Sequence, residues 1–192
     1  MTTGNTTRAV RIGIDLTPTL PGGVNGGAKP ASFDLVELIA DDEARTAVVL
    51  IRASYFEDLP FQHLTNIEVV RVADAFLDSP HPELDPNRGV SLCNALGIDV
   101  LLAPFGDPLL KEVGVPIVSL RYDVQHLDYP EFFSEQELLH RAGADQRLAS
   151  VSDRIITSSA FSKRRMHELL SIPEDRIDVI PLAAPPPPPA ID

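Results

Sequence analysis

The stretch VRIGIDLTPTLPGGVNGGAKPASFDLVELIA, residues 10–40, contains the features that decide the fold. A short apolar run at 10–16 predicts a strand, and an amphipathic run at 30–40 predicts a helix that begins with proline. The segment PGGVNGGAKP joins them and carries four glycines: Gly22, Gly23, Gly26 and Gly27. Because glycine lacks a Cβ and adopts positive φ at low cost, such a loop lets another molecule approach the backbone closely.

The helix that follows this glycine loop predicts what the loop would bind. The first N–H groups of a helix have no partner within the helix, and the positive end of the helix dipole lies beside them. A phosphate or carboxylate group binds well at such a place. Lys29, at the end of the loop, would pair with a phosphate, although an ordinary exposed lysine in a first helical turn explains it equally well. The alternative for the whole segment is a flexible surface loop.

Outward from this stretch, short apolar runs alternate with longer amphipathic runs. Strands are predicted at 10–16, 46–52, 67–72, 100–103, 116–120, 154–157 and 176–180, and helices at 30–40, 55–64, 89–96, 134–150 and 160–170. This alternation predicts an α/β protein with a doubly wound, mainly parallel sheet of about seven strands and helices on both faces, a Rossmann-like fold. Ligands of such folds bind at the carboxyl ends of the strands.

The densest polar segment is RYDVQHLDYPEFF, residues 121–133, directly after the strand at 116–120. Asp123 would orient His126, which would then donate a hydrogen bond to a substrate hydroxyl or act as a general base. The alternative is that Asp123 caps the following turn and His126 packs as a half-buried ring. A metal site at Asp123, His126 and Asp128 matches no known ligand spacing, so we expect no metal.

Three serines lie between the strand at 154–157 and the helix at 160–170: Ser158, Ser159 and Ser162. Capping of the helix by Ser159 is the favoured interpretation, ahead of a ligand role. Lys163, Arg164 and Arg165 follow. They would make peripheral contact with anionic lipid or bind a phosphate, although three charges on a solvated helix face are common.

Composition limits the function classes. The chain has 192 residues and a formal net charge of −12, which argues against nucleic acid as a partner. Cys93 is the only cysteine, so no disulfide framework is expected, and a core position is favoured for it over a nucleophile. No apolar run approaches the roughly 20 residues of a membrane span, and no signal peptide is evident, so a cytoplasmic location is predicted.

The chain ends in LAAPPPPPAID, whose five prolines predict a stiff polyproline II rod. We expect residues 1–184 to form one domain and residues 185–192 to be a linker to a C-terminal domain that the sequence lacks. The alternative is a tail that binds a proline-reading partner. The glycine spacing GGxxGG differs from GxGxxG, and neither a Walker A sequence nor GxSxG occurs, which disfavours a dinucleotide oxidoreductase.

Four ordered segments carry a resemblance to a known family: IGIDLTPTLPGGVNGGAK, VPIVSLRYDVQHLDYPEFFSEQELLHR, SDRIITSSAFSKRR and IPEDRIDVIPL. Together, over about residues 8–182, they resemble the N-terminal half of a family 4 glycosyltransferase with the GT-B fold. The resemblance implies two Rossmann-like domains that face each other across a cleft. The N-terminal domain mainly binds the acceptor, the C-terminal domain binds the nucleotide-sugar donor, and the sugar is transferred with retention of configuration.

The resemblance also implies roles for residues. The four glycines would lie over the donor diphosphate, and the serine loop would lie near the cleft. The family often has a His-Asp pair after the fifth strand, whose histidine helps to hold the transferred sugar; this chain has Tyr122 and Asp123 there, with His126 four residues after Tyr122. Either His126 takes over the sugar contact or Tyr122 supplies a hydroxyl group.

The same resemblance sets the expected partners. They are a nucleotide sugar as substrate, a glycan or other acceptor, and the absent C-terminal domain, with no tightly bound cofactor. Since transfer needs donor and acceptor held together, we expect this chain alone to be inactive. The alternative function is a non-catalytic binding or scaffold domain of the same fold. An exposed apolar cleft face would favour a homodimer in either case.

Overall fold

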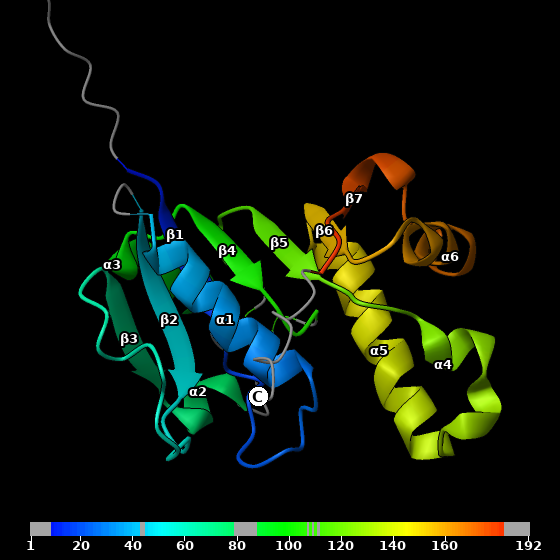
Figure 1. Cartoon of the computed structure of the whole chain (residues 1–192), viewed down its shortest axis with the longest axis horizontal. Coiled ribbons are helices and arrows are strands. Elements are labelled where there is room, and N and C mark those ends of the chain that lie inside the picture. Colours follow the sequence, from blue (N-terminus) through cyan, green and yellow to red (C-terminus); the bar gives the residue numbers. More distant parts are fainter. Residues whose placement is uncertain are drawn as a thin grey trace, which may run out of the picture.

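The computed structural model describes residues 9–42, 45–78, 88–106, 108, 110 and 112–182. Its seven strands are β1 (Arg11–Asp15), β2 (Thr46–Arg52), β3 (Ile67–Val72), β4 (Val100–Ala103), β5 (Ile117–Leu120), β6 (Arg154–Thr157) and β7 (Ile177–Val179). They form one sheet in the order β3-β2-β1-β4-β5-β6-β7, read from left to right in Figure 1, with every neighbouring pair parallel. The strand order reverses between β1 and β4, and a ligand crevice is expected at the carboxyl ends there.

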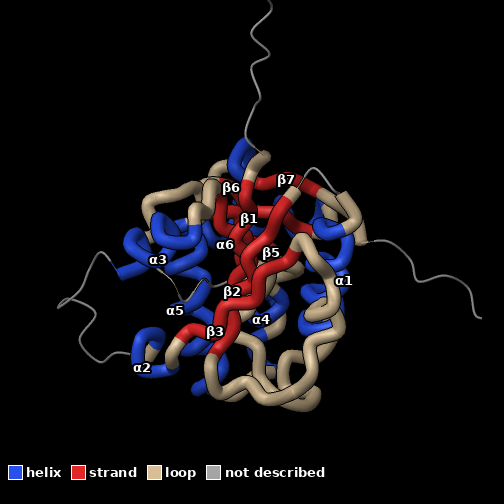
Figure 2. The backbone as a smooth tube through the Cα atoms, turned by 90° about the vertical axis from the view of Figure 1, so that its left-hand side faces the viewer, coloured by secondary structure: helices blue, strands red, loops and turns tan. Residues whose placement is uncertain are grey.

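The helices lie on both faces of this sheet. They are α1 (Ala28–Ala40), α2 (Asp74–Leu77), α3 (Arg88–Leu96), α4 (Gln125–Asp128), α5 (Glu135–Val151) and α6 (Ala160–Leu170), with two 3₁₀ turns at Pro130–Phe132 and Glu174–Arg176. Figure 2 shows α1 on one side of the sheet, and α3 and α5 on the other. The predicted doubly wound, Rossmann-like α/β fold is therefore confirmed.

Among the described residues, strand side chains take part in three apolar cores: two on opposite faces of the sheet around β1 and β2, and a third that joins β6 and β7 to α5 and α6. On the α1 face, Phe33 and Val36 of α1 pack against Ile14 and Val49. On the opposite face, buried strand residues pack against α2 and α3, and fully buried Cys93 belongs to this second core. Burial raises the pKa of the Cys93 thiol to about 11, so the predicted core role is confirmed.

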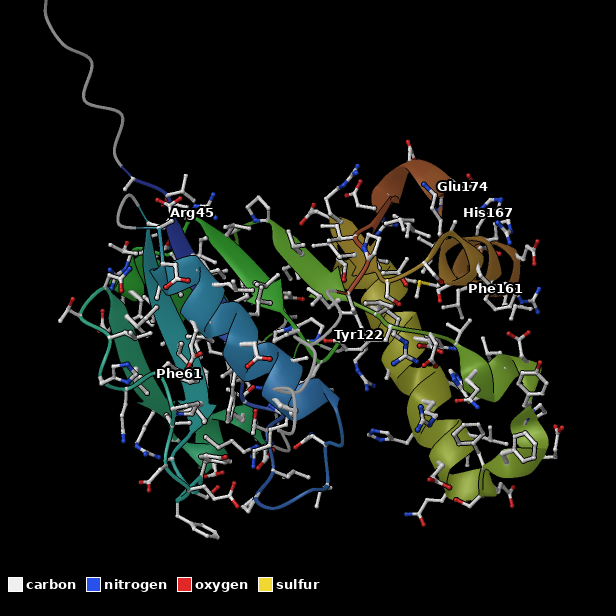
Figure 3. All side chains as sticks on the ribbon, viewed as in Figure 1. Arg45, Phe61, Tyr122, Phe161, His167 and Glu174 are labelled. Atoms are coloured by element: carbon white, nitrogen blue, oxygen red, sulfur yellow. The ribbon has the colours of Figure 1, made fainter. Side chains whose placement is uncertain are left out.

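The helix predicted at 55–64 is wrong, because the structure has turns there. Tyr55 and Leu59 are buried at the i, i+4 spacing of a helical face, but with Phe61 they pack as loop residues in the core on the α1 side. Phe61, labelled in Figure 3, meets the Phe33 ring edge to face, with centroids 5.4 Å apart. Pro60 lacks the N–H that a helix interior requires, which favours the turns.

The helix that begins at Glu135 starts where the sequence places it, because Ser134 and Glu137 form a complete capping box. Ser159 is the N-cap of helix α6, and its side chain accepts a 3.0 Å hydrogen bond from the Ser162 N–H. The predicted capping role of Ser159 is confirmed. The predicted domain end at residue 184 and the polyproline rod lie outside the described residues.

Candidate functional site

A groove of about 1030 Å³ lies at the carboxyl ends of the strands. One wall is the loop that follows β1, with Pro18, Leu20, Val24 and Asn25. Residues that follow β2, β3, β4 and β5 form its floor, and the first half of α5 forms the other wall: Arg52, Ser54, Asp74, Asp78, Phe105, Arg121, Ser134, Gln136, Glu137, His140, Arg141 and Ala144. The sheet topology therefore brings the predicted glycine loop to the groove.

The four glycines of that loop stand in open space. Gly22 and Gly26 have φ of +68° and +54°, so a side chain would strain the backbone at these two positions. A Cβ placed on any of the four, including Gly23 and Gly27, would meet no heavy atom within 4 Å. Packing among the described residues thus does not require these glycines. The absence of side chains leaves room for another molecule to approach the backbone.

The start of α1 remains available to an anion. Gly27 is the N-cap and offers no side-chain cap, and the first turn of α1 contains no acidic residue. The N–H groups of Ala28 and Lys29 therefore have neither a side-chain cap from Gly27 nor a carboxylate in their own turn, and Pro30, the third residue of the helix, has no N–H. This geometry fits the predicted preference for phosphate or carboxylate.

Lys29 braces the glycine loop from within the protein. Its ammonium pairs with Glu57 and donates to the carbonyl oxygens of Leu20, at 3.3 Å, and Gly22, at 3.2 Å. Glu57 also accepts from the Gly22 N–H at 2.7 Å and from the Tyr55 hydroxyl at 2.8 Å. Lys29, then the Gly22 N–H and then Tyr55 lower the pKa of Glu57 to about 2. Since the Lys29 side chain is 14% exposed and engaged, a phosphate would have to share it with Glu57.

The opposite wall rests on a buried charged cluster. Asp145 of α5, 2% exposed, pairs through one oxygen with Arg121 and lies 2.8 Å from the His126 ring nitrogen Nε2 through the other. That last contact has the distance of an ion pair but lacks the alignment of a hydrogen bond. Burial lowers the pKa of His126, and Arg121 and Arg141 lower it further, against the raising effect of Asp145. The imidazole is therefore favoured in its neutral form.

The residues predicted for catalysis lie near this cluster but do not converge. Tyr122 is half-buried where β5 ends (Figure 3), and burial raises the pKa of its hydroxyl. Asp123 is exposed and accepts from the Gln125 N–H at 3.0 Å, which is the turn cap that the sequence left open as an alternative. His126 is 1% exposed, so its ring is more deeply buried than the half-buried alternative supposed. Asp128 pairs with Arg165.

The serine loop lies at a second, smaller hollow of about 290 Å³, which Ser162 lines together with Asp123 and Phe161. Phe161 is labelled in Figure 3. Two members of the basic trio on α6 are engaged, because Lys163 donates to the Ile177 carbonyl oxygen at 2.8 Å and Arg165 pairs with Asp128 and Glu168. Arg164 is exposed.

Sequence reasoning missed Glu57 and Asp145. Glu57 lies in the segment that was predicted to be helical, where no pairing with Lys29 could be foreseen. Asp145 did leave a signal: it lies seven residues after Leu138 and three before Leu148, on the apolar stripe of its helix. A carboxylate on such a stripe indicates a buried partner of opposite charge.

Within the part of the chain that the structure describes, no three histidine, cysteine, aspartate or glutamate side chains gather in a way that would hold a metal ion. No helix in this part is both long and apolar enough to cross a membrane.

The parallel seven-stranded sheet, with helices on both faces, defines a Rossmann-like α/β protein. Its fold is similar to that of HepE from Anabaena, solved in complex with UDP and glucose, with a TM-score of 0.56 and 21% sequence identity. The similarity covers 90% of this chain and 44% of HepE, so the chain spans less than half the length of that protein. At this identity the likeness shows the fold alone. No family model and no curated protein matches the sequence.

Proposed function

We propose that this chain is the N-terminal, acceptor-side domain of a retaining glycosyltransferase of the GT-B fold, resembling family 4. The enzyme transfers a sugar from a nucleotide-sugar donor to a glycan or other acceptor. One observation carries the proposal: four glycines with no atom within 4 Å of an added Cβ lead into the start of α1 beside the large groove.

The chemistry of sugar transfer gives such a loop a purpose. Negative charge develops on the diphosphate as the bond to the sugar breaks. Fixed N–H groups and the positive end of a helix dipole stabilise this charge without having to reorient. The brace of Lys29 and Glu57 would keep these N–H groups in place before the donor arrives.

The likeness to HepE supports the same proposal. That protein was solved with UDP and glucose, and this chain matches 44% of it. In the proposed enzyme a second domain provides the rest of the donor site, and the nucleotide sugar is a substrate rather than a bound cofactor. Because transfer requires donor and acceptor in one geometry, we expect no turnover from this chain alone.

The sugar contact in this proposal falls to Tyr122 or His126, at the end of β5. His126 is 1% exposed and lies against Asp145, so it reaches the sugar only if its segment shifts when the second domain closes. Tyr122 is half-buried and needs a smaller change. Asp123 remains the turn cap that shapes this segment.

Titration of the ¹⁵N-labelled chain with UDP, followed by amide NMR, tests the proposal. We expect the signals of residues 22–29 to shift with weak affinity, on the order of 1 mM, because only one part of the donor site is present. Gly23→Leu should weaken this response and Gly23→Ala less so, while both variants keep the unfolding midpoint of the wild type. An unresponsive loop would favour the scaffold alternative, and submicromolar binding would contradict a donor site that depends on a second domain.

A further inference from the structure

The arginines that line the groove differ in how their charge is balanced. Arg52 makes two hydrogen bonds to Asp78, at 2.6 and 2.8 Å, and a third to Asp74 at 3.2 Å. Arg121 pairs with buried Asp145. These two guanidinium groups are therefore already matched by carboxylates of the protein.

Arg141 is the groove arginine without such a match. It is half-buried on α5, and its guanidinium carbon lies 4.6 Å from the centroid of the Phe133 ring. Within the described residues, no carboxylate forms an ion pair with it. Asp145, one turn further along α5, already contacts Arg121 and His126 through its two oxygens.

The nearest acid toward the N-terminus of α5 is Glu137, and it is also engaged. Ser134 donates to Glu137 from its N–H at 2.9 Å and from its hydroxyl at 2.7 Å. These two bonds lower the pKa of Glu137, and the charge of Arg141 lowers it a little further. The charge of Arg141 thus affects the pKa of Glu137, but the two side chains do not form an ion pair.

The surroundings of Arg141 suit an anionic group. Its charge adds to that of Arg121, whose carboxylate partner is the buried Asp145 that also contacts the neutral His126 ring. The guanidinium lies over the Phe133 ring, and a planar guanidinium matches a carboxylate or phosphate through two parallel hydrogen bonds. A compensating negative charge is the component that no described residue provides.

We propose that Arg141 binds a negatively charged group, a phosphate or a carboxylate, on the acceptor that occupies the groove. The identification of the bound molecule as the acceptor rests on the proposed function, whereas the anion site itself does not. Arg141 and the glycine loop lie on different walls of this groove. The proposal therefore assigns the charged group of the acceptor to α5 and the donor diphosphate to the loop. The acceptor is then an anionic molecule, such as a phosphorylated or acidic sugar.

Binding of three matched sugars tests the proposal: glucose, glucose 1-phosphate and glucuronate, titrated into the protein by NMR and calorimetry. We expect both charged sugars to bind about tenfold more tightly than glucose, as charge-assisted hydrogen bonds allow. Arg141→Gln should abolish this difference, and Arg141→Lys, which keeps the charge but loses the planar fork, should retain part of it. The control Arg164→Gln removes an equal charge from the exposed face of α6 and should retain it all.

The outcomes separate this inference from the proposed function. Equal binding of glucose and glucose 1-phosphate by the wild type overturns it, as does an unchanged preference in Arg141→Gln. If Arg141→Gln instead loses the UDP response of residues 22–29, Arg141 belongs to the donor side and the acceptor assignment is overturned. If UDP leaves the loop unmoved while the preference for charged sugars depends on Arg141, the anion site stands and the proposed function fails.

Discussion

The two walls of the groove are built in opposite ways. The glycine-loop wall presents bare backbone at Gly23 and Gly27, and its charged pair, Lys29 and Glu57, braces the loop. The α5 wall presents charged side chains, with Asp145 buried behind Arg121. Under the two proposals, recognition on the first wall would depend on main-chain groups and free space, whereas recognition on the second would depend on side-chain charge.

This difference predicts different sensitivities to mutation. A backbone site tolerates changes of charge around it but is blocked by added volume. A charged cluster tolerates small changes of volume but is disrupted when one charge loses its partner, because an unpaired charge in a dry environment is costly. Substitutions matched across the two walls can therefore test the contrast.

The largest effect is expected from Asp145→Ala. This change leaves the guanidinium of Arg121 without its carboxylate in a site where Asp145 and His126 are 2% and 1% exposed. Loss of one partner of a buried pair costs about 3–5 kcal/mol of unfolding free energy. Urea denaturation measures it. The control Asp178→Ala breaks the pair with Arg154, whose side chains are 47% and 46% exposed, and should cost far less. Equal losses in the two variants would contradict the contrast.

A pair of glycine substitutions gives the next largest effect. In β1, a Cβ on Gly13 would lie 2.9 Å from Cδ1 of Ile98 and 3.1 Å from Cδ1 of Leu101, so Gly13→Ala should cost about 1–3 kcal/mol through overpacking. Gly23→Ala, which points into open space, should change stability by no more than about 0.5 kcal/mol. Thermal and urea unfolding compare them. A large loss in Gly23→Ala would mean that the loop glycines serve the fold rather than a ligand.

These results also indicate how far the sequence alone could go. All seven strands were predicted, because central strands such as β2 are buried on both faces and leave short apolar runs, and the less buried edge strands β3 and β7 are still rich in valine and isoleucine. The helix predicted at 134–150 is confirmed as α5, and its start has a local cause, the capping box of Ser134 and Glu137. The segment 55–64 failed because Phe61 is fixed by Phe33 of α1, a contact across 28 positions that no local pattern encodes.

The site divides along the same line. The glycine loop was predictable, since glycine reports directly on the backbone. The partners of Lys29 and Arg121 were not, because Glu57 and Asp145 lie 28 and 24 residues away from them along the chain. Charge pairing is decided by tertiary structure, so the wall that uses side chains was the less predictable of the two.

A smaller effect is expected from Glu57→Gln, measured against pH. The folded protein holds the pKa of Glu57 at about 2, below its ordinary value of 4.5. Its stabilising contribution is therefore complete above pH 4.5 and is lost as the pH falls toward 2. In Glu57→Gln, this part of the pH dependence of unfolding should vanish, and the Gly22 amide should exchange faster at neutral pH. Asp34→Asn, an exposed carboxylate on α1, is the control and should leave both unchanged.

The smallest effect is expected on the pKa of buried His126, which responds to the charges of the α5 wall. Burial lowers its pKa below 6.5, and the nearby Arg121 and Arg141 add to that lowering, while Asp145 opposes it. The fold therefore favours the neutral ring, and this contribution to stability is present above pH 6.5 and is lost as the pH falls below it. Arg141→Gln removes one positive charge that lowers the pKa of His126, so NMR titration of the ring protons should give a higher pKa than in the wild type. The control Arg164→Gln should leave the pKa of His126 unchanged. An anion bound at Arg141 should raise the pKa of His126 in the same direction. If neither Arg141→Gln nor glucose 1-phosphate raises the pKa of His126, the charge of Arg141 does not act in the groove. The description of the α5 wall as a charged recognition surface would then be contradicted.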